Sequence, residues 1–141
     1  MGLFSGINNT LKKSEAAVVV QDLLEQQVRA GLFNLSAAPF ANQLVQTIWR
    51  HKSEVLDGSQ GPRPHKITIA AMALSTGVLL MDQGDLNRNG LILALGHLLD
   101  DVQRNGGLYS FNGLDHALLG SAASTFEQVA KELDGAVPLG A

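Results

Sequence analysis

The side chains best suited to bind a metal or move a proton are the histidines that share helical spacing with a carboxylate. His97 is followed three residues later by Asp100, and His51 is followed at the same interval by Glu54. Residues three or four apart lie on one face of an α-helix, so each pair could present two ligands together. Two such faces that meet inside a bundle can hold a metal. The alternative is surface ion pairing near helix C-termini, where a positive imidazole is favoured.

A second chemical motif occupies residues 85–92, with the sequence DLNRNGLI. Asp85, Asn87 and Asn89 place side-chain oxygens at alternate positions, and a glycine follows them. This segment resembles the first part of an EF-hand calcium loop, in which alternate oxygen ligands converge on one ion and the glycine makes the sharp turn. It departs from that family further on, because the position of the family's bidentate Glu is Gly96 here. The alternative is an interhelical turn whose polar side chains cap free backbone amides.

The sequence carries none of the common catalytic signatures. It lacks a Ser-centred nucleophile elbow, an HExxH zinc motif and a Gly-rich phosphate loop. With no cysteine it forms no disulfide, thiolate metal site or Cys nucleophile. Asp115 and His116, with Ser110 or Ser121, supply the residue types of a catalytic triad, but their spacing predicts no triad geometry. The sequence therefore favours a protein without enzymatic activity and predicts no cofactor.

Length and composition indicate the kind of domain that must position these residues. A chain of 141 residues has the usual size of one domain. Apolar residues make up 45% of it and aromatic residues only 5%, which favours tightly packed helices over a β-sandwich. The net charge of -3 and the short, interrupted basic runs are not typical of a nucleic-acid-binding surface. We therefore expect no nucleic-acid partner.

The spacing of apolar residues predicts a helical bundle. Apolar side chains recur at intervals of three and four, the period of an α-helix, in five segments. These segments are residues 14–30, 37–57, 66–83, 90–104 and 112–134. The third segment is apolar nearly all round, so it is expected to be the central helix. The sequence predicts an all-α, compact bundle of about five helices, as a single domain over residues 14–134 with a flexible tail over 135–141.

Residues 1–13 are expected to form an amphipathic lead segment. Leu3, Phe4, Ile7 and Leu11 share one helical face, and two lysines follow them. This pattern suits docking on a partner or a membrane surface, or packing back on the bundle as an extension of the first helix. Elsewhere the longest apolar run, 67–81, is shorter than the roughly 20 residues of a membrane span. We expect a cytoplasmic protein that does not associate with membranes.

Apolar residues outside the predicted core stripes give the leading functional hypothesis. Exposed apolar clusters are typical of protein interfaces. The candidate partner-binding residues are Leu3, Phe4, Ile7, Leu108, Tyr109 and Phe111. They favour an interaction or regulatory module that binds a protein partner or forms a homo-oligomer. The alternative is a weak metal- or ligand-binding domain that uses the loop from Asp85 to Asn89 or the face of His97 and Asp100.

Overall fold

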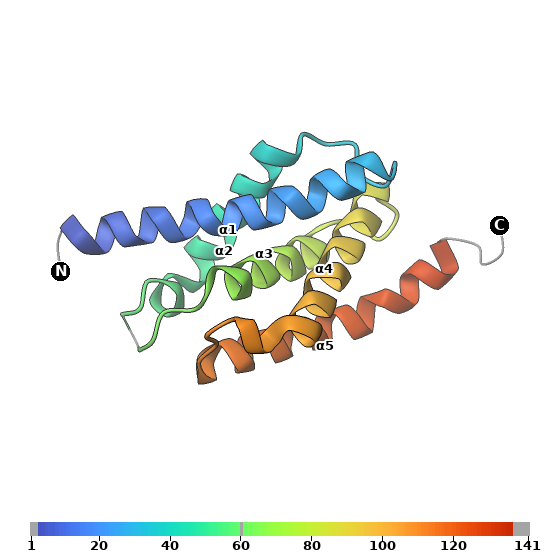
Figure 1. Cartoon of the computed structure of the whole chain (residues 1–141). Coiled ribbons are helices and arrows are strands. Elements are labelled where there is room, and N and C mark those ends of the chain that lie inside the picture. Colours follow the sequence, from blue (N-terminus) through green and yellow to red (C-terminus); the bar gives the residue numbers. More distant parts are fainter. Residues whose placement is uncertain (1–2, 60, 137–141) are drawn as a thin grey trace.

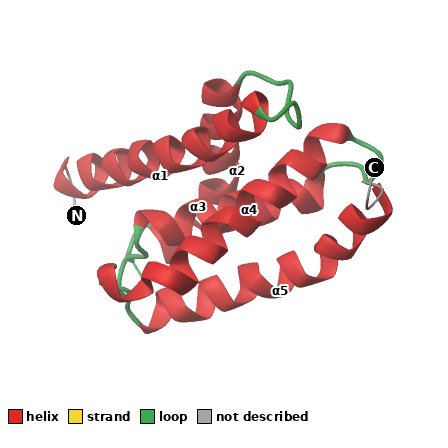
Figure 2. Cartoon of the chain, turned by 45° about the vertical axis from the view of Figure 1, so that its right-hand side comes forward, coloured by secondary structure: helices red, strands yellow, loops and turns green. Residues whose placement is uncertain are grey.

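A computed structural model describes the backbone of residues 3–59 and 61–136, and the side chains of residues 8–59 and 61–133. The described residues form α-helices and one short 3-10 helix, η1, without a β-strand (Figures 1 and 2). In chain order the elements are α1 (Leu3–Arg29), α2 (Ala37–Leu56), α3 (Lys66–Leu80), α4 (Leu86–Asn105), η1 (Gly106–Leu108) and α5 (Gly113–Ala136). The predicted all-α bundle is confirmed.

Helix α3 occupies the middle of the bundle, as its apolar sequence predicts. It packs against α1, α2, α4 and α5, whereas α1 and α5 lie on opposite sides of it and do not pack on each other (Figure 1). Every residue from Ile67 to Leu74 is buried. A helix that is apolar on all sides is stable only where other elements cover all of its sides, and α3 has that position.

Helix α1 begins before residue 14, where the first predicted helical segment starts. It is continuous from Leu3 to Arg29, so the lead segment extends the first helix, which is one of the alternatives that the sequence left open. Gly6 and the neighbouring asparagines each weaken a helix by up to about 1 kcal/mol, but none of them blocks its hydrogen bonds as proline would. The packed part of α1 therefore propagates helix toward the N-terminus, because extension costs less than nucleation.

The connections between the helices follow from local backbone chemistry. Gly31 ends α1 with a φ of 77°, a left-handed conformation that glycine adopts without strain, and Gly58 follows α2 in a similar conformation. Helix α3 ends at Leu80, before the predicted boundary. Helix α4 starts at Leu86, earlier than predicted, because the side chain of Asp85 caps it. Within the described residues, no helix combines the length and the apolar character needed to cross a membrane.

Candidate functional site

The residues that resemble a calcium loop form a helix cap and an interhelical contact. The carboxylate of Asp85 accepts a hydrogen bond from the backbone N–H of Asn87, at 2.9 Å. The side chain of Asn87 is buried, where it accepts from the backbone N–H of Asn34 at 2.8 Å and donates to the Asn34 side chain at 2.9 Å. Asn89 lies on the same first turns of α4. Since alternate residues of a helix point in different directions, the three side chains do not converge on one point.

His97 and Asp100 lie on α4 but line different depressions of the surface. His97 lines a depression between α1 and α4, together with Asp101 and Asp22. Asp100 lines a groove between α4 and α5 and forms an ion pair with Arg104, at 3.1 Å. Among the side chains that the structure describes, no three His, Asp or Glu residues are grouped so that they could hold a metal ion.

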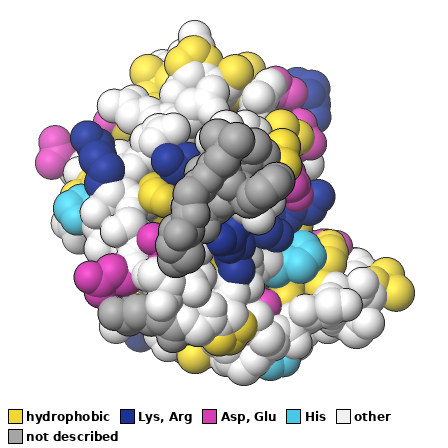
Figure 3. All heavy atoms as spheres, turned by 90° about the vertical axis from the view of Figure 1, so that its left-hand side faces the viewer, with side chains coloured by type: hydrophobic (Ala, Val, Ile, Leu, Met, Phe, Trp, Pro, Cys, Tyr) yellow, Lys and Arg dark blue, Asp and Glu magenta, His cyan; other side chains and the backbone are white. Residues whose placement is uncertain are grey.

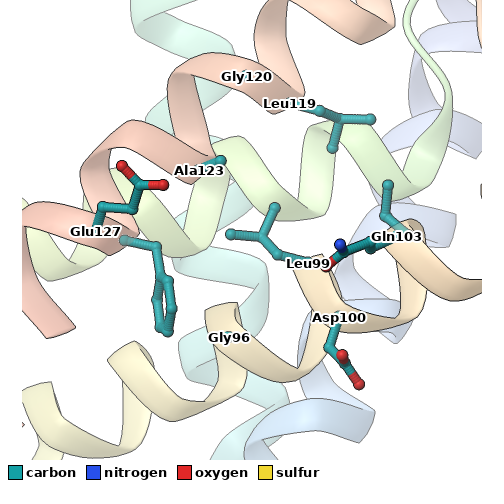
Figure 4. A pocket seen from close by; sticks show the side chains of 10 residues that line it. Gly96, Leu99, Asp100, Gln103, Leu119, Gly120, Ala123 and Glu127 are labelled. Carbon is teal, nitrogen blue, oxygen red and sulfur yellow. The ribbon is translucent and has the colours of Figure 1, made fainter.

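The groove between α4 and α5 has a volume of about 530 Å³ (Figure 4). Its apolar lining includes Leu99, Leu119 and Phe126, of which Leu99 and Phe126 are only half-buried. The ring of Phe126 lies against Gly96, where an added Cβ would come within 2.8 Å of it. Asp100 and Glu127 contribute carboxylates to the two sides of the groove. The groove is therefore an apolar surface with two carboxylates at its edge.

The structure describes the side chains of only three of the six predicted partner-binding residues, and these three differ in exposure. The side chains of Leu3, Phe4 and Ile7 lie outside the described residues. Leu108 is 83% exposed, whereas Tyr109 and Phe111 are partly buried and pack on the core. The latter two pack against each other with ring centroids 5.1 Å apart. Of the residues around η1, Leu108 is thus the one most available to a partner.

Tyr109 and Phe111 belong to an aromatic cluster around His65. The His65 ring meets the Tyr109 ring at 5.5 Å and the Phe111 ring at 5.4 Å, edge to face in both cases. Its Nδ1 accepts the backbone N–H of Ile67, so His65 caps α3. Burial lowers the pKa of His65, and the positive charge of Lys12 lowers it further. Because Nδ1 accepts the N–H of Ile67, it carries no proton, and the cap requires the neutral imidazole.

Asp115 is a buried carboxylate that joins three segments near the start of α5. It is 1% exposed and accepts the backbone N–H groups of His65, at 2.8 Å, and Asn112, at 3.0 Å. The Asn112 side chain accepts the N–H of Asp115 in return, so the two side chains form a reciprocal capping arrangement. The carboxylate thus bonds to backbone groups, while the adjacent His116 is exposed and packs its ring near Phe111. Asp115 therefore has a structural role, tying the loop before α3 to α5.

Three exposed leucines lie close together in the sequence, at the turn between α3 and α4. Leu79, Leu80 and Leu86 are 61%, 67% and 74% exposed. Two exposed aspartates, Asp82 and Asp85, lie between them. We call these five residues the leucine turn. Single exposed leucines are common on protein surfaces, but several at one turn are typical of an interface.

The sequence pattern did not identify the leucine turn. Leu79 and Leu80 continue the apolar run of α3, so the pattern assigns them to the buried central helix. In the structure α3 ends at Leu80, and no part of the chain that the structure describes covers these two side chains. The only sequence signal for the exposure is that Asp82 follows immediately, since charged residues usually lie at the surface.

Comparisons of the chain with known protein families, with curated proteins and with solved structures found no match.

Proposed function

We propose that the protein is a non-enzymatic interaction module that associates with further copies of itself through the leucine turn. The supporting observation is the exposure of Leu79, Leu80 and Leu86, each more than 60%. Burial of apolar surface stabilises a complex by about 25 cal/mol per Å², so an uncovered group of leucines favours association. A rim of charged side chains around an apolar centre is the usual composition of an interface.

Sedimentation velocity over a range of concentrations tests this function. We expect the wild-type chain to sediment above its monomer mass of 14.9 kDa at high concentration. The variant L79S/L80S/L86S should remain a monomer. Because the three side chains are exposed, their replacement should change stability little, and thermal unfolding checks this point.

A matched control removes exposed apolar surface elsewhere. Val18 and Val28, on α1, are 54% and 43% exposed. The variant V18S/V28S should associate as the wild type does. A wild-type chain that stays monomeric up to its solubility limit would contradict the proposed function, as would equal association by the leucine variant and the wild type.

A further inference from the structure

We infer that the leucine turn of one copy receives the N-terminal turns of α1 from a second copy, so that the molecules join head to tail. This inference rests on the proposed function, because it names the partner of the same surface. The leucine turn is apolar and acidic. The segment of residues 3–13, LFSGINNTLKK, is apolar and basic. The leucine turn and this segment are therefore complementary in residue type, both in polarity and in charge.

The leucine turn carries two exposed carboxylates, those of Asp82 and Asp85. Helix α3 ends beside them with the free carbonyls of a helix C-terminus. The nearby cation, Arg88, is buried and forms an ion pair with Glu132 on α5. A positively charged partner would therefore meet the exposed carboxylate of Asp82, and that of Asp85 which also caps α4, beside the exposed leucines.

The opposite end of the molecule carries the complementary features. Leu11 belongs to the apolar stripe of the segment, and it is 53% exposed, so the bundle does not cover the stripe at this position. Lys12 and Lys13 follow it, with the Lys13 ammonium 5.2 Å from the centroid of the Trp49 ring. Viewed from this end, Lys and Arg side chains are at the surface, interspersed with Asp and Glu side chains (Figure 3). An amphipathic helix with lysines at one end suits an apolar surface edged by carboxylates.

The two surfaces cannot meet within one molecule. Helix α1 has 27 residues, and at 1.5 Å per residue it spans about 40 Å. The leucine turn lies beyond its far end, where Asn87 of α4 bonds to Asn34 of the loop after α1. Figures 1 and 2 both show the start of α1 and the α3–α4 turn at opposite ends of the bundle. A continuous helix does not fold back, so only a second copy can supply the segment.

Head-to-tail contact joins two different surfaces, so each molecule keeps one of each free for the next. The α4–α5 groove fits the lysine-bearing segment less well, because Arg104 already pairs with Asp100 at its edge. Contact through the leucine turn also predicts a specific behaviour that a symmetric dimer does not share. A chain that lacks the leucine turn and a chain that lacks the apolar residues of segment 3–13 should still form one contact with each other, and so a dimer.

Mixing two complementary variants tests the inference. The tail variant, L79S/L80S/L86S, keeps residues 3–13 intact, and the head variant, F4S/I7S/L11S, keeps the leucine turn intact. Each should be a monomer alone, and an equimolar mixture should sediment as a dimer that does not grow further. Circular dichroism of each variant checks that the helices remain, and the V18S/V28S variant serves as the control for loss of exposed apolar surface.

Charge reversal provides a second measurement on the full chain. K12E and D82K should each weaken association by about two- to fivefold, the range for exposed ion pairs, and the double variant K12E/D82K should recover part of that loss. Wild-type association without dimer formation in the mixture would overturn the head-to-tail contact but leave the proposed self-association intact. A wild-type chain that stays monomeric would overturn the proposed function, and this inference with it.

Discussion

The buried guanidinium of Arg88, on α4, forms an ion pair with the carboxylate of Glu132, on α5, while its Nε donates to the backbone carbonyl of Val78, on α3, at 2.8 Å. One side chain thus links three helices. The Arg88 side chain is 6% exposed and that of Glu132 is 30% exposed. If the ion pair is broken, water can therefore hydrate the Glu132 carboxylate more readily than the Arg88 guanidinium.

This difference predicts unequal effects of removing each partner. R88M should destabilise the fold by about 3 kcal/mol, because it leaves the Val78 carbonyl and the Glu132 carboxylate without their donor. E132Q should cost less, about 1 kcal/mol, since the amide oxygen still accepts from Arg88. Urea unfolding measures both changes, and the double variant gives the coupling between them. Equal costs for the two single variants would contradict the assignment of Arg88 as the buried partner.

Two glycines on helices should respond to alanine in opposite ways. A Cβ on Gly90 would lie 2.4 Å from the backbone carbonyl oxygen of Leu32, so G90A must displace the loop after α1 and should destabilise the fold by about 1–3 kcal/mol. A Cβ on Gly120 meets no atom within 4 Å. G120A should therefore stabilise α5 by about 0.5–1 kcal/mol through higher helix propensity. Chemical denaturation of both variants gives the two signs, and destabilisation by G120A would contradict the open surroundings.

The stability of the fold should fall in mild acid because of His65. The pKa of His65 in the folded state is lowered, first by burial and then by Lys12. The charged groups that face it also include Lys66, Glu15 and Asp115. The unfolded chain therefore binds a proton that the folded chain resists, and stability decreases as pH falls below about 6.5, the ordinary value for histidine.

The variant H65N separates this titration from helix capping. Asparagine can still accept the N–H of Ile67, so H65N should keep most of the stability at pH 8 and depend less on pH between 7 and 5. H65A should lose about 1 kcal/mol at pH 8 because the cap is absent. Urea unfolding at several pH values measures both effects. An unchanged pH dependence in H65N would rule out His65 as the cause.

Tyr109 provides a direct spectroscopic measurement of its contact with Asp101. It is the only tyrosine in the chain, so the tyrosinate absorbance during a pH titration reports this side chain alone. The hydroxyl donates to the Asp101 carboxylate at 2.5 Å, and this hydrogen bond raises the pKa of Tyr109 above its ordinary value of 10.0. D101A should lower the pKa toward that value. D100A, at the adjacent exposed position, is the control and should leave the titration unchanged.

The sequence alone determined the fold class and most of the helices. Apolar residues at intervals of three and four mark the helices locally, and the apolar third segment marks its own central position because only burial on all sides suits it. Gly31 and Gly58 directly follow the first two predicted helical segments, and their left-handed backbone conformations suit a helix end. The start of α4 was less visible, since Asp85, Asn87 and Asn89 suit both an ion-binding loop and a capped helix. The choice between them depended on Asn34, a residue 53 positions from Asn87.

The tertiary structure decided which side chains are buried and which are left for a partner. Arg88 and Asp115 are buried because their partners, 44 and 50 residues away in the chain, come to them only in the folded bundle. Leu79 and Leu80 are exposed although their helix is the most buried. An all-apolar helix has no polar side to indicate its orientation, so the sequence could not show at which residue the neighbouring helices stop burying it. The lengths and packing of those helices determine that residue, and they leave the leucine turn at the surface.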